Sequence, residues 1–325
     1  WNKIKKSKRI AMTLHYGPDG DSLGSCTAMR YVLERDMKCK VTLVSGDPVE
    51  ENLSYLPCAK EVQFGRDFAD MDLNEFDVIL SIDCANLGML SSKERGKFTL
   101  SNNSKIIQID HHATNTYFGG MNYVDSGMPS ACSVLVELFR KTGVKFDAEL
   151  SRRLLLGICT DTGFFAYDNN PLIAMKQAVF LIEQGVDYYN EISRPIRMSE
   201  SLSAKKLFAT LINNIRVNEK KHFAYSSISL EDAKKLGLNS AELRGGVRAL
   251  QDLKGMDFVF ALVEQDGYIK GSFRSSINVD VSLFAKALGG GGHKPAAAFQ
   301  LDKISLKDAQ KKVLEAIEKV GVHRY

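Results

Sequence analysis

The sequence predicts a two-domain α/β protein in which a parallel sheet is followed by a smaller α/β unit. Three observations predict this fold class. The chain has 325 residues, more than one domain usually holds. Through the first 170 residues, short apolar runs alternate with helical patterns, as in parallel sheets. Further apolar runs follow a stretch without apolar periodicity.

Four strands are expected in the first domain, each an apolar run bounded by polar or turn residues. They cover Ile10–His15, Lys40–Ser45, Asp77–Asp83 and Lys105–Asp110. Apolar residues at helical spacing predict helices at Ser22–Asp36, Ser130–Thr142, Ala148–Cys159 and Asn170–Gln184. Strands that alternate with helices pair in parallel, so their carboxyl ends are expected at one edge of the sheet.

A domain boundary is expected where Ser, Arg and Pro occur with little apolar periodicity. The chain then divides into a first domain at 1–190, a linker at 191–204 and a second domain at 205–325. In the second domain, strands are expected near His222–Ser227, Phe258–Glu264 and Tyr268–Arg274, and a helix at Ser305–Val320.

The composition excludes several classes of protein. A charged fraction of 25% and only seven prolines exclude a disordered or collagen-like chain. No apolar run approaches the roughly 20 residues that cross a bilayer, and no signal-peptide pattern is present. The six cysteines form no CxxC pair and are expected to be free core residues. We therefore expect a cytoplasmic protein with no membrane partner.

Charge is distributed unevenly along the chain. Residues 1–204 contain 23 basic and 26 acidic side chains, whereas residues 205–325 contain 20 and 13. This asymmetry is expected of a protein that binds cations in its acidic half and anions in its basic half. Ordinary surface variation is the alternative that composition alone leaves open.

Carboxylate and imidazole side chains follow three of the four strands expected in the first domain. They are His15, Asp19 and Asp21 after the first strand, Asp83 after the third, and Asp110, His111 and His112 after the fourth. A Pro-Asp-Gly turn predicts that the first three share an irregular loop before a helix that begins near Ser22. Asp161 adds a carboxylate where a predicted helix meets a loop.

Any one of these residues would more often be a helix cap, a turn residue or a core residue. Together at one sheet edge, they would repel one another or stay unpaired unless a cation joined them. Oxygen and imidazole ligands suit Mn²⁺ or Mg²⁺. Two such ions about 3.5–4 Å apart, sharing a carboxylate, activate water and stabilise in-line displacement at phosphorus. These residues therefore predict a metal-assisted phosphoester hydrolase.

The second domain offers an anion site beside a run of glycines. In a loop, the backbone N–H groups of Gly289–Gly292 could approach an anion closely, although such a run can also be a flexible linker. A strand-end guanidinium and two serine hydroxyls could add donors to a phosphate. The candidate phosphate-binding residues are Arg274, Ser275, Ser276, Gly291, Gly292 and His293. Arg244 and Arg248 could also reach a substrate, or lie on a solvated helix face.

The motifs HYGPDGDS, SIDC, IDHH and CTDTG, in this order, resemble the four motifs of the DHH phosphoesterase family. The segment GGGGHKPAAAF resembles the signature of the DHH-associated C-terminal domain, with its final glycine replaced. This resemblance covers nearly the whole chain. The two-domain layout and the segment DHHATNTYFGGMNYVD most resemble the nanoRNase / pAp-phosphatase (NrnA) type of that family.

The resemblance implies a role for each candidate residue. His15 and Asp19 would hold one metal ion, Asp21, His111 and Asp161 would hold the other, and Asp83 would bridge them. Asp110 would orient a histidine, and His112 would contact the scissile phosphate or protonate the leaving oxygen. Two divalent ions are expected as cofactors, with Mn²⁺ as the expected metal and Mg²⁺ and Co²⁺ as alternatives.

The family's activity implies hydrolysis of short oligoribonucleotides to 5′-mononucleotides, and of 3′-phosphoadenosine 5′-phosphate to AMP. The active site is expected in an interdomain cleft that limits substrate length. A phosphodiesterase for cyclic dinucleotides or pApA is an alternative, and a nucleotide-binding sensor without turnover is another. The expected partner is short RNA or a nucleotide. The oligomeric state is open, with a homodimer among the alternatives.

Overall fold

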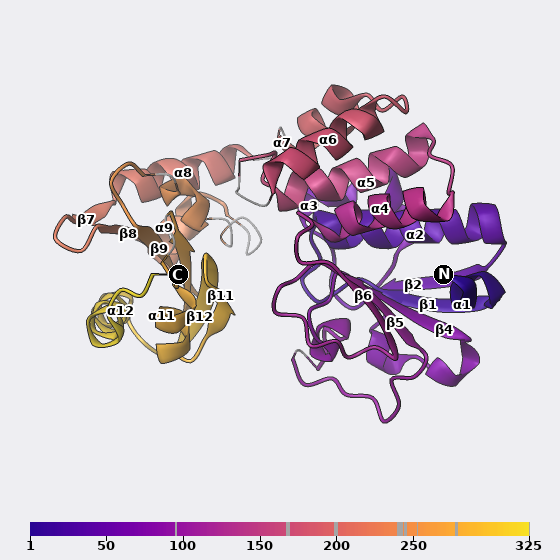
Figure 1. Ribbon diagram of the computed structural model, residues 1–325. Helices are drawn as coiled ribbons and strands as arrows, with labels where there is room; N and C mark the ends of the chain where they lie inside the picture. Colours follow the sequence, from indigo (N-terminus) through magenta and orange to yellow (C-terminus); the bar gives the residue numbers. More distant parts are fainter. Residues whose placement is uncertain are drawn as a thin grey trace. The chain divides into compact units, whose positions relative to one another are not determined.

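The computed structural model describes residues 1–94, 96–166, 170–197, 201–238, 243, 246–251, 253–276 and 279–324. The chain forms two compact units, Trp1–Ser199 and Glu200–Tyr325. Figure 1 draws the first unit in indigo to rose and the second in salmon to yellow. All six cysteines are buried free thiols, which confirms the sequence prediction. Among the described residues, none of the helices has the length and apolar character needed to cross a membrane.

The first unit is built on a six-stranded sheet in which all neighbours pair in parallel, in the order β3-β2-β1-β4-β5-β6. Its strands are β1 (Arg9–Thr13), β2 (Lys40–Ser45), β3 (Gln63–Phe64), β4 (Val78–Ile82), β5 (Ile106–Asp110) and β6 (Met121–Val124). The four expected strands and their parallel pairing are confirmed. Sequence analysis missed β3, which has two residues, and β6, whose side chains are exposed or half-buried.

Helices cover one face of this sheet, as Figure 1 shows. α2 (Gly20–Met37) and α4 (Ala131–Thr142) pack against the sheet, α5 (Ala148–Asp161) packs on these two helices, and α6 (Pro171–Ile182) packs on α5 and α4. Alternate strand residues such as Met12 and Leu80 join the core under these helices, while Ala11 and Ile79 face a second core on the other side. Short helical turns and loops supply that second core with Phe68 and other side chains.

Shorter elements complete the first unit. The α-helices are α1 (Asn2–Lys6), α3 (Glu51–Ser54) and α7 (Arg194–Arg197). The remaining turns are η1 (Pro57–Glu61), η2 (Phe68–Asp70), η3 (Leu73–Glu75), η4 (Leu87–Leu90) and the π-helical η5 (Tyr188–Ser193). The segment 191–204, expected as a linker, includes α7 and the start of the next helix.

The second unit has its own six-stranded sheet, in the order β11-β12-β10-β9-β8-β7. All neighbours are antiparallel except the parallel pair β8–β9. Its strands are β7 (Arg216–Asn218), β8 (Phe223–Ile228), β9 (Phe258–Gln265), β10 (Tyr268–Ser275), β11 (Gly291–His293) and β12 (Ala296–Asp302). The three strands expected here are therefore present, at β8, β9 and β10.

Both faces of the second sheet are covered. Phe258 and Phe260 of β9 join a core that includes α11 (Ser282–Ala287) and α12 (Leu306–Val320). The alternate residue Val263 faces the other side, where it packs with α8 (Leu202–Asn213) and α9 (Leu230–Lys235). The turn η6 (Gly246–Leu250) lies on that side too. Period-two alternation along β9 thus fixes which face meets which helices.

Candidate active site

The strand order of the first sheet creates a place for a ligand between β1 and β4. The chain moves from β1 to β2 and β3 in one direction, and from β4 to β5 and β6 in the other. In open parallel sheets, ligands bind beyond the carboxyl ends of the strands where the order reverses in this way. His15 follows β1 and Asp83 follows β4, so both lie at this point.

Asp19 and Asp21 lie at the start of α2, and one of them is not in the expected loop. The helix begins at Gly20, so Asp21 is in its first turn, which corrects the start predicted near Ser22. The reason is a cap: Asp19 Oδ1 accepts hydrogen bonds from the backbone N–H groups of Asp21 and Ser22, each 3.0 Å long. A side chain at Gly20 would collide with Thr160 of α5. Because glycine has no side chain, this turn can pack closely against α5.

The Asp21 carboxylate is held by two hydrogen bonds from the N-terminus of another helix. Its Oδ2 accepts a 2.6 Å hydrogen bond from Ala131 N–H, and its Oδ1 a 3.0 Å bond from Cys132 N–H. Both donors belong to the first turn of α4, whose dipole also favours a negative charge. A Cβ at Gly157 would lie 2.4 Å from Asp21 Oδ1, so the glycine makes room for the carboxylate.

His15 and Asp19 lie near one oxygen of Asp83. His15 Nε2 is 3.7 Å from Asp19 Oδ1 and 3.5 Å from Asp83 Oδ2. His15 Nδ1 donates to the Tyr16 carbonyl at 2.9 Å. Because a carbonyl can only accept, Nδ1 carries the proton and Nε2 faces the carboxylates. These three side chains form one group with potential metal-ligand atoms within 4.8 Å of one another.

A second group of side chains lies near the other oxygen of Asp83, Oδ1. His111 Nε2 is 3.5 Å from Asp83 Oδ1, 3.6 Å from Asp161 Oδ2 and 3.9 Å from Asp21 Oδ2. Asp161 is the last residue of α5, at the junction where the sequence placed it. Asp83 therefore lies between the two groups, with its backbone at φ 61°. Its N–H donates to the Ile109 carbonyl at 3.0 Å, which fixes this left-handed residue beside β5.

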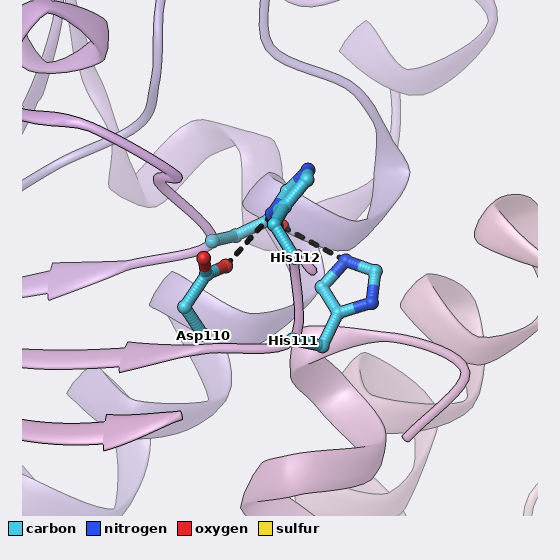
Figure 2. A group of neighbouring side chains, drawn as sticks. Asp110, His111 and His112 are labelled. Carbon is cyan, nitrogen blue, oxygen red and sulfur yellow. Dashed lines mark hydrogen bonds and ion pairs between the residues drawn. The ribbon is translucent and has the colours of Figure 1, made fainter. Parts of the chain in front are cut away.

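Asp110 and His112 lie beside the second group, in a further set of potential metal-ligand residues that also includes Asp83 and His111. His112 Nδ1 is 3.8 Å from Asp83 Oδ1. His112 Nδ1 lies 2.8 Å from Asp110 Oδ1, at hydrogen-bond distance. Figure 2 shows Asp110 facing His112, with the ring of His111 directed away from Asp110. Asp110 is fully buried, whereas the His112 side chain is 23% exposed. The histidine that Asp110 contacts is thus His112, and His111 points to the carboxylates of Asp83, Asp21 and Asp161.

Electrostatics show that this cluster attracts positive charge. Burial and the Asp83 carboxylate raise the pKa of Asp21 to about 7. Burial and Asp21 raise the pKa of Asp161 well above its ordinary value. Burial works to lower the pKa of His111, but Asp83 and the neighbouring carboxylates raise it to about 10. These carboxylates repel one another, and divalent cations would offset that repulsion.

The donor set therefore fits two divalent cations. Each group offers carboxylate oxygens and one imidazole nitrogen, and Asp83 directs one oxygen to each. Burial works to raise the pKa of Asp83, but His111 and His15 hold it well below its usual range, so Asp83 is ionised. Oxygen and imidazole ligands suit Mn²⁺ and Mg²⁺. The six residues that would hold the ions are His15, Asp19, Asp21, Asp83, His111 and Asp161.

The residues expected to bind an anion come from the inner strand β10, the residue after it, and the edge strand β11. Arg274 and Ser275 end β10, and Ser276 follows them. The β-sheet register pairs both Arg274 and His293 with Ala296, so the backbones of these two residues flank one position of β12. Arg274 Nη1–H donates to the Phe273 carbonyl at 2.8 Å.

The glycine run differs from the predicted loop, because Gly291 and Gly292 belong to the edge strand β11. The glycines allow the backbone at 290–292 to approach β12 closely. A Cβ at Gly290 would lie 2.2 Å from the Ala298 carbonyl oxygen, and one at Gly292 would lie 2.5 Å from Ala297 Cα. Arg248 is exposed on η6. Arg244 and the side chain of His293 lie outside the described residues.

Asn115 is the residue that sequence analysis missed. Its side-chain amide donates a 2.5 Å hydrogen bond to Asp110 Oδ2. The segment DHHATN contains it three residues after His112, but nothing local shows that a loop amide returns to the end of the preceding strand. Its contact is decided by the course of the chain after β5.

Comparisons with known proteins agree with this two-part architecture. The sequence model of the DHH family N-terminal domain matches residues 9–158, and that of the DHHA1 domain matches residues 220–319. A protein of Streptococcus mutans named as a probable bifunctional oligoribonuclease and PAP phosphatase NrnA is 27% identical, over 91% of this chain and 90% of its own. The bifunctional oligoribonuclease and PAP phosphatase NrnA of Thermus thermophilus is also 27% identical, over 95% and 89%.

Among solved structures, an exopolyphosphatase-related protein from Bacteroides fragilis shares the fold, with a TM-score of 0.89 and 23% identity. The match covers 98% of this chain and 94% of that one. Both units of the chain therefore have counterparts in one known structure.

Proposed function

We propose that this chain, which belongs to the DHH family and carries a DHHA1 domain, hydrolyses short oligoribonucleotides and 3′-phosphoadenosine 5′-phosphate. The observation that carries the proposal is the pair of ligand groups that share Asp83 at the carboxyl edge of the sheet. The relatives from Streptococcus mutans and Thermus thermophilus are named for these two activities, the first as a probable enzyme, and they match over about nine-tenths of both chains. The products would be 5′-mononucleotides.

The two substrates present the same bond to the site. Cleavage of an oligoribonucleotide into 5′-mononucleotides breaks the bond between phosphorus and the 3′-oxygen of the preceding ribose. Removal of the 3′-phosphate from 3′-phosphoadenosine 5′-phosphate breaks the bond between phosphorus and a ribose 3′-oxygen as well. One arrangement of catalytic groups can therefore serve both reactions, provided that each substrate places this bond at the cluster.

Two divalent cations would be held by the six residues of the Asp83 cluster, with Mn²⁺ as the preferred ion. Bound there, they would lower the pKa of a water molecule and offset the charge that develops on the phosphoryl oxygens. Asp83 would be shared between them, while the N-terminus of α4 keeps the Asp21 carboxylate in place.

His112 would donate the proton that the leaving group needs. As the oxygen of water bonds to phosphorus, the bond from phosphorus to the 3′-oxygen breaks, and its electron pair goes to that oxygen. His112 Nε2–H gives its proton to the 3′-oxygen, and the proton released by water leaves to solvent. Asp110 holds the opposite ring nitrogen at 2.8 Å and, with burial opposing it, raises the pKa of His112.

The second unit would bind the rest of the substrate through an anion site. Arg274 can offer two parallel N–H donors to a phosphate, with hydroxyl groups at Ser275 and Ser276 beside it. The backbone of β11, with Gly291, Gly292 and His293, lies two strands away in the same sheet.

The test is hydrolysis of four substrates side by side with added Mn²⁺: pApA, a five-nucleotide RNA, 3′-phosphoadenosine 5′-phosphate and cyclic di-AMP. We expect mononucleotide release from the first three. Cleavage of cyclic di-AMP at a comparable rate would assign the protein to cyclic dinucleotide breakdown instead. No hydrolysis of any of the four, with metal bound, would contradict the proposal and indicate a nucleotide-binding sensor.

A further inference from the structure

We propose that Asn115 is a positioning residue for His112 and acts through the carboxylate of Asp110. The inference rests on the proposed function for its catalytic consequence, since it assigns His112 to proton transfer. Its structural part stands on three hydrogen bonds of the Asn115 amide and on the complete burial of Asp110. Asn115 itself would not contact the reacting atoms.

The orientation of the Asn115 amide is fixed by its partners. Its Nδ2 donates to Asp110 Oδ2 at 2.5 Å and lies 3.4 Å from the Cys84 carbonyl oxygen. Its Oδ1 accepts the backbone N–H of Tyr117 at 2.6 Å. A carbonyl only accepts and a backbone N–H only donates, so the reversed amide would lose both backbone partners. Nitrogen therefore faces Asp110.

This amide completes the hydrogen bonding of a buried carboxylate. His112 Nδ1 lies 2.8 Å from Asp110 Oδ1, and Asn115 Nδ2 donates a hydrogen bond to Oδ2. With both oxygens engaged, the carboxylate cannot rotate without breaking one of these bonds. Loss of Asn115 would leave Oδ2 buried without this donor, which costs free energy and lets the carboxylate turn away from His112.

The Asp110 carboxylate in turn selects the state of the His112 ring. A carboxylate at Nδ1 favours a proton on that nitrogen, which leaves Nε2 as the atom that faces outward. Nε2 is the nitrogen that the proposed reaction needs. A freely turning ring would present this atom only part of the time, so the rate of the chemical step would fall while substrate binding changed little.

The loop that carries Asn115 is anchored to the end of the neighbouring strand. Thr116 N–H donates to the Ala85 carbonyl at 2.8 Å, two residues after the shared ligand Asp83. Tyr117 has a φ of 52°, a strained value for a residue with a side chain, and the Asn115 amide oxygen binds its N–H. Asn115 thus joins the loop after β5 to the segment that follows β4.

The experiment compares Asn115→Ala and Asn115→Asp with Asn122→Ala as the control. Asn122 is in β6, and its side-chain amide also bonds loop backbone: its Oδ1 accepts the N–H of Gly119 and its Nδ2 donates to the Gly119 carbonyl. The Asp variant can still accept from Tyr117 N–H but cannot donate to Asp110. We expect kcat to fall about 10- to 100-fold in both Asn115 variants, with KM near the wild-type value. Asn122→Ala should keep the wild-type kcat.

A second measurement follows the His112 ring without any substrate. Protein labelled with ¹⁵N-histidine and loaded with Mg²⁺ is studied by NMR, and His112→Gln identifies the His112 signals. We expect a protonated Nδ1 with a slowly exchanging proton in the wild-type protein and in Asn122→Ala. That proton should exchange rapidly in both Asn115 variants, whose fold and metal content are checked by circular dichroism and metal analysis.

Unchanged His112 signals in a folded Asn115→Ala protein would overturn the inference, as would wild-type kcat in both Asn115 variants. A rise in KM with kcat retained would also overturn it, because it would place Asn115 in substrate binding. If the wild-type protein hydrolysed no phosphoester but its His112 signals responded to Asn115 as expected, the proposed function would fail and the positioning contact would stand.

Discussion

Both units bury aromatic rings, but the N-terminal unit also buries charged side chains, whereas the charged groups in the described part of the C-terminal unit are at least partly exposed. Among the described residues of the first unit, the buried Asp, His and Arg residues are His15, Asp21, Asp67, Asp83, Asp110 and Arg153. Among the residues that the structure describes in the second unit, the buried polar ones are Ser226 and Gln265, and the core contains Phe223, Phe258, Phe260, Phe273, Phe284 and Phe299.

This contrast matches the two kinds of ligand. Carboxylates that hold cations are most effective when water is excluded, and their mutual repulsion is then offset by the metal. A phosphate of a flexible substrate needs donors that are accessible, and an arginine at the end of a strand provides them. The buried charges of the site therefore reduce the stability of the first unit. The aromatic core of the second unit stabilises it and is separate from its proposed site.

The largest effect is expected for Asp83→Ala, which removes the carboxylate shared by both ligand groups. Activity should fall by more than about 1,000-fold, beyond the roughly 10- to 100-fold cost of losing a group that only supports a ligand. Both metal ions should be lost together, as measured by metal analysis after gel filtration. Full metal content in this variant would contradict the role of Asp83.

Asp77→Ala is the matched control, because Asp77 precedes the same strand that Asp83 follows. Its Oδ2 accepts the backbone N–H groups of Lys8 and Arg9 at the opposite edge of the sheet. This variant should lose some stability and keep its metal ions. Loss of metal in both variants would show that the effect of Asp83→Ala comes from damage to the strand.

Phe273→Ala tests the other half of the contrast. Phe273 is fully buried, and its ring lies 5.4 to 5.6 Å from those of Phe260, Phe284 and Phe299. The cavity left by the missing ring should lower the free energy of unfolding of the second unit by about 3–5 kcal/mol. Denaturant titration followed by hydrogen exchange in β9 and β10 measures this, and metal binding by the first unit should persist. Loss of metal binding would show that the units are not separable.

Metal addition should stabilise the first unit selectively. The single tryptophan, Trp1, packs against Phe139 with ring centroids 6.0 Å apart, so its fluorescence reports on this unit. With Mn²⁺ at about 100 times its Kd, the free energy of unfolding should rise by about 3 kcal/mol per site, and chelation should reverse the change. Hydrogen exchange in β9 and β10 should not change. A fluorescence transition insensitive to Mn²⁺ would argue against the metal site.

The smallest effect is expected for Arg274→Ala. Loss of a charge-assisted contact to phosphate should raise KM about 10- to 100-fold, while kcat for bound substrate and the metal content stay near wild type. Arg216→Ala is the control, because it removes an exposed arginine of β7, at the opposite edge of the sheet from β11. Steady-state kinetics with 3′-phosphoadenosine 5′-phosphate separate the two constants. If Arg274→Ala changed only stability, the anion site would have to lie elsewhere.

The sequence by itself determined the elements and the chemical groups at their ends. Apolar runs with helices between them implied a parallel sheet, and parallel strands bring their carboxyl ends to one edge. That is why residues as distant in sequence as His15, Asp83 and His111 could be expected near one another. The strong local patterns of α4, α5 and α12 also set their bounds to within a few residues, because caps and periodicity are local properties.

Only the tertiary structure decided how these groups are held. The bonds from α4 to Asp21 join residues more than 100 positions apart, and the Asn115 amide finds Asp110 through the course of a loop. The glycine run at 291–292 became an edge strand because another strand lay beside it. Such contacts depend on which segments meet in space, whereas periodicity, turns and caps depend on neighbours in the chain.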